Sequence, residues 1–214
     1  MADDPVCQEE NCERKAQWRV NIDGVMLTQN YFGLGENSTG GALWDSSIVL
    51  WEKVRTMDLA SRCVLELGSG VGFLAIKLAA SGANVVATDG DEEALPIFRA
   101  NVKRNTTDDI PALHLKWGDN ETLATFRARY PKDSHFDYVM GADLIFNADY
   151  HEALLQTLNE VVVSPATRLL MAYRIRDEER EETFVARLQG HFTLLHSEVV
   201  GDTDIVYMEL QRRA

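Results

Sequence analysis

In the middle and later parts of the chain, short apolar runs alternate with segments whose apolar positions recur every three or four residues. The first pattern is typical of buried strands and the second of amphipathic helices. The expected strands are 63–67, 84–88, 113–117, 136–142 and 168–173. The expected helices are 43–57, 73–81, 92–105, 121–130, 150–163 and 178–190. Strands and helices in alternation predict a parallel, doubly wound sheet.

Both ends of this pattern depart from strict alternation. Near the C-terminus, apolar runs at 193–200 and 204–209 are joined only by a short turn, which cannot make a parallel crossover. Near the N-terminus, runs at 17–22 and 25–31 flank Asp23-Gly24, a pair suited to a tight hairpin turn. We therefore expect an α/β fold with one Rossmann-like seven-stranded sheet, mostly parallel with an antiparallel C-terminal hairpin, preceded by an N-terminal β-hairpin.

The length of 214 residues favours one compact domain. The expected divisions are a flexible tail at 1–15, a hairpin and loop at 16–43, and the α/β domain at 44–214. A 45% hydrophobic content and 26% charged content are ordinary for a globular protein. A chain of this length buries enough surface to hold its core without disulfides or a metal.

Net charge and cysteine content indicate which binding partners and which cellular compartment to expect. The net charge of −13 repels phosphate backbones, so we expect no nucleic-acid partner, whereas a basic protein segment would be attracted. Cys7 and Cys12 lack a second ligand pair, so no metal site is expected. Three cysteines and an acidic N-terminus without a secretory pattern indicate a reducing compartment, the cytoplasm with the nucleus as second choice. No apolar stretch reaches 18 residues, so no membrane anchor is expected.

The candidate chemistry begins where the first sheet strand meets a glycine-rich turn. The run ELGSGVG at 66–72 places Gly68, Gly70 and Gly72 between that strand and a helix. Glycines there let the backbone approach a bound nucleotide closely, and the next strand ends in Asp89, which can accept both ribose hydroxyls. The pattern predicts a nucleoside cofactor, with a tight turn that binds nothing as the alternative.

Two features separate the possible cofactors. The dinucleotide fingerprint requires a glycine where this chain has Phe73, and the Lys-Ser or Lys-Thr of a phosphate loop is missing. Glu66 adds a carboxylate that a pyrophosphate would avoid and an ammonium group would accept. S-adenosylmethionine (SAM) carries adenosine and an ammonium group but no phosphate, so the residues favour SAM over NAD.

The sequence resembles the class I SAM-dependent methyltransferases. More narrowly, it is similar to the non-SET protein lysine methyltransferases of methyltransferase family 16. Besides the glycine motif, the resemblance rests on WD at 44–45, LKWG at 115–118, GADLIF at 141–146 and RIR at 174–176. It covers roughly residues 40–209, most of the chain.

The resemblance implies a role for individual residues. The cofactor-binding residues would be Trp44, Glu66, Gly68, Gly70, Gly72, Asp89, Trp117, Gly118 and Asp119. Asp143 and Phe146 would face the methyl group as the catalytic residues, and Phe146 in place of the usual tyrosine removes a hydroxyl contact to the acceptor. From their position in the chain alone, the N-terminal hairpin and residues 32–41 are expected to shape the acceptor entrance.

Each assignment has a purely structural alternative. Trp44, Trp117 and Phe146 could be core residues, and Asp143 could cap the following helix. Asp45 is expected to cap its own helix. The acidic run 177–182 is expected to be the solvated start of a helix, with docking of a basic substrate as the alternative.

The expected function is transfer of a methyl group from SAM to a lysine ε-amine of a protein, with S-adenosylhomocysteine as product. Methyltransfer to a small molecule, arginine, histidine or an N-terminal amine remains open, as does a non-catalytic SAM-binding scaffold. The family acts on chaperones, translation factors and other proteins, so the resemblance leaves the target open. We expect a monomer.

Overall fold

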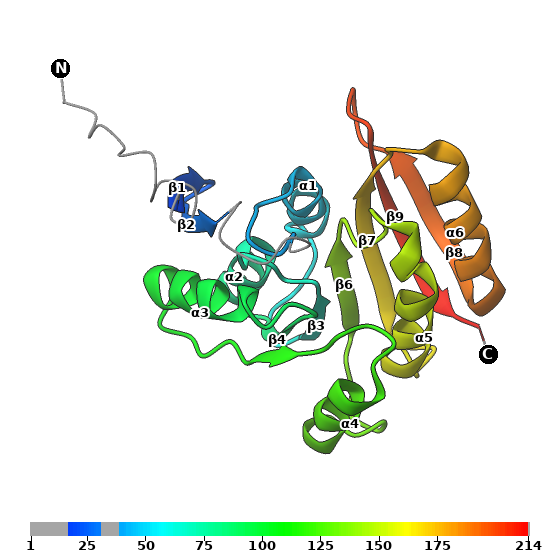
Figure 1. Cartoon of the computed structure of the whole chain (residues 1–214), viewed down its shortest axis with the longest axis horizontal. Coiled ribbons are helices and arrows are strands. Elements are labelled where there is room, and N and C mark those ends of the chain that lie inside the picture. Colours follow the sequence, from blue (N-terminus) through cyan, green and yellow to red (C-terminus); the bar gives the residue numbers. More distant parts are fainter. Residues whose placement is uncertain (1–16, 31–38, 214) are drawn as a thin grey trace, which may run out of the picture.

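The computed structural model describes residues 17–30 and 39–213 (Figure 1). The expected tail at 1–15 and most of the loop at 32–41 lie outside these residues. The strands are β1 (Gln17–Ile22), β2 (Val25–Asn30), β3 (Cys63–Leu67), β4 (Asn84–Asp89), β5 (Ala112–His114), β6 (Tyr138–Ala142), β7 (Arg168–Arg174), β8 (Phe192–Val199) and β9 (Ile205–Arg212). The helices are α1 (Asp45–Val54), α2 (Phe73–Ala80), α3 (Ala94–Asn105), α4 (Asn120–Arg129), the short 3-10 helix η1 (Ala148–Tyr150), α5 (His151–Val161) and α6 (Glu178–His191).

Seven strands form one sheet in the order β5-β4-β3-β6-β7-β9-β8. The first five in this order are parallel, and β9 is antiparallel to both β7 and β8. The predicted fold is therefore confirmed, including the antiparallel C-terminal hairpin. The chain moves outward from β3 to β5 and then returns to β6 on the other side of β3. Such a reversal opens a crevice at the carboxyl ends of the strands, where α/β sheets bind ligands.

The sheet separates two apolar cores. Helices α1, α2 and α3 pack on one face, and α4, α5 and α6 pack on the other. The central strand β3 is buried from Val64 to Leu67, as expected for a strand covered on both faces. Among the described residues, no helix combines the length and the apolar character needed to cross a bilayer.

The N-terminal hairpin forms a separate two-stranded sheet. Its turn is the expected one, because Asp23 and Gly24 both have positive φ angles, 47° and 81°. The side chain of Asn101 on α3 attaches this hairpin to the domain. Its Oδ1 accepts from the Thr28 amide at 2.8 Å, and its Nδ2 donates to the carbonyls of Thr28 and Val71 at 3.0 and 2.8 Å.

Three expected boundaries were wrong for identifiable reasons. Helix α1 begins only at Asp45, because Trp44 has an extended backbone and holds the N-cap position. Asp45 therefore does not cap this helix, and its carboxylate pairs with Arg174 at 2.6 Å. Strand β5 ends at His114, so Trp117 lies in the connection to α4. Phe136 precedes β6 and packs against Phe126 instead of extending the strand.

Candidate active site

A cavity of about 900 Å³ lies at the carboxyl ends of the central strands. It occupies the crevice created by the reversal of the chain at β3. Of the residues predicted for the site, those that line this cavity are Trp44, Gly68, Gly70, Asp89, Trp117, Asp143 and Phe146. Residues just before α1, just after β3 and at the ends of β4 and β6, distant in sequence, thus meet around one space.

Asp89, at the end of β4, is hydrogen-bonded to the turn that follows β3. Its Oδ2 accepts from the backbone amide of Gly70 at 2.8 Å, and its Oδ1 accepts from the amide of Asp91 at 2.9 Å. The carboxylate is 8% exposed, and burial raises its pKa above the ordinary value, although the amide hydrogen bonds oppose this. A carboxylate has about four acceptor positions, so Asp89 keeps capacity for hydroxyl donors on the cavity side.

The turn after β3 leaves room at the cavity because Gly70 has no side chain. Gly70 has a φ angle of +50°, and a Cβ atom there would lie 3.2 Å from the carbonyl oxygen of Gly40. Residue 70 must therefore be small for the segment at 40–42 to pass over the turn. This close approach of two backbones forms one wall of the cavity.

The charge of the lining fits SAM better than a phosphate-bearing cofactor. The cavity lining holds five carboxylates and two basic side chains: Asp89, Asp91, Glu92, Glu93 and Asp143 against Lys116 and Arg176. A pyrophosphate would be repelled by this excess of carboxylates, while the sulfonium and ammonium groups of SAM are cations. The indole Nε1 of Trp117 is also buried without a hydrogen-bond partner among the described residues. The residues present therefore fit SAM: Asp89 would hold its ribose, and Gly68 and Gly70 would leave it space.

Glu66 and Gly72 flank the turn but do not line the cavity. Glu66 is 3% exposed within β3, and burial raises its pKa to about 8. It is therefore mostly neutral at pH 7, which weakens the argument that its charge attracts an ammonium group. Gly72 holds the N-cap position of α2 with a φ angle of +91°.

Gly118 and Asp119 also lie outside the lining, although Trp117 is part of it. The Gly118 amide donates to Thr157 on α5 at 3.0 Å. Asp119 caps α4 by accepting from the Thr122 amide at 2.8 Å. Both residues therefore fix the connection that carries Trp117.

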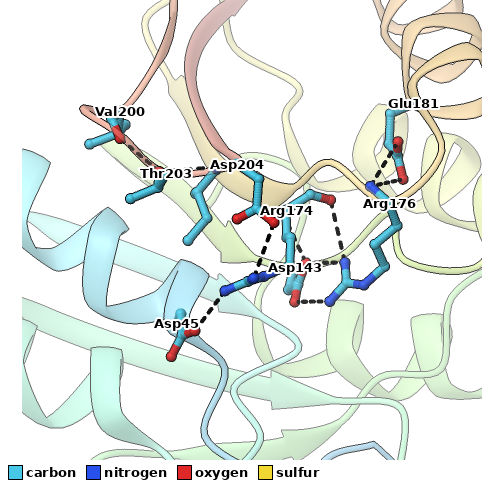
Figure 2. A network of polar contacts seen from close by, with 9 residues as sticks. Asp45, Asp143, Arg174, Arg176, Glu181, Val200, Thr203 and Asp204 are labelled. Carbon is cyan, nitrogen blue, oxygen red and sulfur yellow. Dashed lines mark hydrogen bonds and ion pairs between the residues drawn. The ribbon is translucent and has the colours of Figure 1, made fainter.

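Asp143 sits at the end of β6 in a left-handed backbone conformation, with φ at +58°. Its carboxylate forms a two-pronged ion pair with Arg176, with distances of 2.8 Å from Nη1 to Oδ1 and 2.7 Å from Nη2 to Oδ2 (Figure 2). The Arg174 amide also approaches Oδ1, at 3.3 Å. Asp143 therefore does not cap a helix, and Asn147 caps the following η1 instead.

An aromatic pair stands beside Asp143. Phe146 and Tyr150 both line the cavity, and their ring centres are 6.2 Å apart. Tyr150, which is 41% exposed, brings a hydroxyl group to the part of the cavity where Phe146 has none. The side chain of Trp44 borders the same region, with the Arg176 guanidinium 5.7 Å from its ring centre.

Arg176 and Tyr150 line the cavity but were not predicted from the sequence as site residues. Arg176 belongs to the RIR segment, which was noted without a role for its side chains. Tyr150 lies four residues after Phe146, and nothing in a single sequence indicated that the short helix η1 turns it toward the cavity. The acidic run at 177–182 is exposed at the start of α6, as expected, except at Glu181. Glu181 is 2% exposed and accepts from the amides of Arg176 and Asp177, the latter at 2.9 Å.

Comparison with known proteins places the chain in a family. The family model described as lysine methyltransferase matches residues 28–191. The protein N-lysine methyltransferase METTL21A of Danio rerio is 33% identical over 94% of this chain and 90% of its own. EEF1A lysine methyltransferase 3 of Xenopus tropicalis is 29% identical over 72% of this chain and 65% of its own. The T. thermophilus 16S rRNA methyltransferase RsmC, solved with AdoMet and guanosine, shares the fold with a TM-score of 0.61, at 19% identity over 92% of this chain and 50% of its own.

Proposed function

The chain belongs to the lysine methyltransferase family, and on that premise we propose that it transfers the methyl group of SAM to the ε-amine of a lysine in a protein substrate. One observation carries the proposal. The glycine turn and Asp89, suited to a nucleoside, line the same cavity as Asp143 and Phe146, which belong to a different strand end. Cofactor and acceptor can therefore meet in one space.

Bound SAM supplies an electrophilic methyl carbon, to which the lysine Nζ lone pair forms a bond while the carbon–sulfur bond breaks and S-adenosylhomocysteine leaves. The protein's contribution is alignment and exclusion of water. Asp89, Gly68 and Gly70 would hold the nucleoside end. Asp143 would orient the amine as a hydrogen-bond acceptor, and the rings of Trp44 and Phe146 would exclude water.

The acceptor we propose is a lysine in a basic segment of a soluble protein such as a translation factor or chaperone. The net charge of −13 would attract such a segment and repel nucleic acid. The name of the Xenopus relative, an EEF1A lysine methyltransferase, supports a translation factor. We further propose that the protein acts as a monomer in the cytoplasm, with the nucleus as second location.

Labelling with isotopically marked SAM tests this function. The protein is incubated with labelled SAM and a cell lysate, and labelled proteins are digested and analysed for methylated residues by mass spectrometry. The wild type should place the label on lysine, and Asp143→Asn should lose most of this activity while still binding SAM. Asp149→Asn is the matched control, because Asp149 is exposed on η1.

Two results would contradict the proposal. One is label on arginine, histidine, an N-terminal amine or a small molecule instead of lysine. The other is no labelled product from a wild-type protein that binds SAM in calorimetry, which would favour a non-catalytic scaffold.

A further inference from the structure

The ion pair between Asp143 and Arg176 raises a question about how a lysine enters the cavity. A lysine ε-amine is protonated at neutral pH, since its unperturbed pKa is about 10.4, and the ammonium form has no lone pair to attack a methyl group. An isolated buried carboxylate at Asp143 would favour the ammonium form. In this structure the carboxylate is already engaged, because both of its oxygens accept from the Arg176 guanidinium.

Building on the proposed function, we propose that Arg176 is a positioning residue that fixes the Asp143 carboxylate and balances its charge, so that the cavity receives the acceptor lysine as its neutral amine. The lysine releases its proton to water as it enters, and the Nζ lone pair of the neutral amine is then free to form its bond to the methyl carbon. A guanidinium at the cavity wall opposes a second cation nearby, and the paired carboxylate can still accept a hydrogen bond from a neutral amine.

The surroundings hold Arg176 in this position. Glu181, buried on α6, accepts from the backbone amide of Arg176 at 3.3 Å (Figure 2). The Arg176 guanidinium also lies over the ring of Trp44 at 5.7 Å. The side chain of Arg176 is 30% exposed and that of Asp143 is 6% exposed, so the pair is accessible mainly from the arginine side. Both residues line the cavity.

The other charged groups near the pair are engaged elsewhere. From β7, Arg174 directs its guanidinium to Asp45 on α1 and to Asp204 in the β8–β9 turn, at 2.6 and 3.1 Å (Figure 2). These three residues line a second, separate cavity of about 540 Å³ that does not include Asp143 or Arg176. Asp177, next to Arg176, pairs with Arg180 at 2.9 Å. At this end of the cavity the acceptor thus meets the Asp143–Arg176 pair and the hydroxyl-bearing side chain of Tyr150. The other titratable lining residues come from the β4 and β5 side and are Asp89, Asp91, Glu92, Glu93, His114 and Lys116.

The pH dependence of methyl transfer tests this inference. The acceptor is the purified protein that the labelling experiment identifies, and single-turnover rates at saturating SAM are measured between pH 6.5 and 10. The rate should rise with pH as the acceptor lysine loses its proton, and the midpoint of this rise is the readout. A residue that only supports the fold would change the rate without moving this midpoint.

Four proteins form a charge cycle. Arg176→Met leaves a net negative charge at the site and should move the midpoint upward by about one pH unit or more. Asp143→Asn leaves a net positive charge and should move the midpoint downward, although its rate is low. The double variant Asp143→Asn/Arg176→Met removes both charges and should return the midpoint toward the wild-type value. Arg180→Met, which removes an exposed arginine outside the cavity, should leave the midpoint unchanged.

The cycle remains decisive if one variant fails. Thermal unfolding and SAM calorimetry establish which variants fold and bind. If Arg176→Met does not fold, Arg176→Lys, which keeps the charge but loses the two-pronged contact, should hold the wild-type midpoint with a lower rate. An Arg176→Met midpoint equal to that of the wild type would overturn the inference, and where that variant does not fold, an Asp143→Asn midpoint equal to that of the wild type would overturn it. A wild type that methylates no lysine would instead overturn the proposed function.

Discussion

The carboxylate of Asp89 at the end of β4 accepts a 2.8 Å hydrogen bond from the backbone amide of Gly70, in the turn after β3. These two residues come from adjacent parallel strands, and their contact fixes the acid against the turn whose open side faces the cavity. The backbone amide thereby fixes the orientation of the Asp89 carboxylate, whose oxygens can still accept hydrogen bonds from a ligand. Under the proposed function, we expect the position of a bound nucleoside to depend on this contact.

Asp89→Asn should weaken SAM binding about 10- to 100-fold, equivalent to about 1.5–3 kcal/mol for hydrogen bonds to a charged group. The amide keeps the size of the side chain but replaces one acceptor oxygen with a donor. That donor would face either the Gly70 or the Asp91 amide, or the ligand. Isothermal titration calorimetry with SAM measures the effect, and Asp108→Asn, exposed beyond α3, is the control. Equal affinity of Asp89→Asn and wild type would contradict the role assigned to Asp89.

Gly72→Ala should destabilise the fold by about 2–4 kcal/mol, from a left-handed backbone and overpacking together. Its φ angle is +91°, and a Cβ atom would lie 2.8 Å from Cδ2 of Phe98 in the core. Gly190→Ala is the matched control, because Gly190 lies in α6 with open space around it, and alanine should there be neutral or stabilising by up to about 1 kcal/mol. Urea denaturation of both variants gives the comparison, and a similar effect of both substitutions would refute the packing argument.

Glu66→Gln should change the pH dependence of stability. Burial raises the pKa of Glu66 from 4.5 in the unfolded chain to about 8, so the folded state binds the proton more tightly. Between pH 4.5 and 8 the wild type should therefore lose stability relative to Glu66→Gln as pH rises, by up to about 1.4 kcal/mol per pH unit. Urea denaturation of both proteins at several pH values measures this difference. A difference that stays constant across the window would show that Glu66 is ionised in the folded protein.

Asn101→Ala should cost about 2–4 kcal/mol and loosen the N-terminal hairpin. Asn101 is fully buried, and its removal leaves the Thr28 amide and the carbonyls of Thr28 and Val71 without their partner. Hydrogen exchange of the β2 amides should accelerate together with the drop in unfolding free energy. The control is Asn84→Ala, whose side chain donates at the surface, and which should change stability by no more than about 0.5 kcal/mol. Unchanged exchange in β2 would mean that other contacts hold the hairpin.

The larger features of this protein follow from local patterns. Apolar runs and helical periodicities were enough to predict the seven-stranded sheet, because burial on both faces makes a strand such as Cys63–Leu67 apolar at every position except Glu66. The glycine turn and Asp89 could likewise be recognised from the sequence, since residues at the carboxyl ends of parallel strands lie on the same side of the sheet. Element boundaries were less accurate where one side chain decides them, as Trp44 does for α1.

The sequence by itself determined the fold class and the family and predicted a nucleoside site, because each depends on short patterns that can be recognised one segment at a time. Only the tertiary structure decided that Asp143 pairs with Arg176, 33 residues away, and that Glu66 and Gly118 stand outside the cavity. Pairing between distant side chains depends on how neighbouring strands and the turns after them are aligned in space. That alignment is set by packing of the whole domain and leaves no local pattern in the sequence.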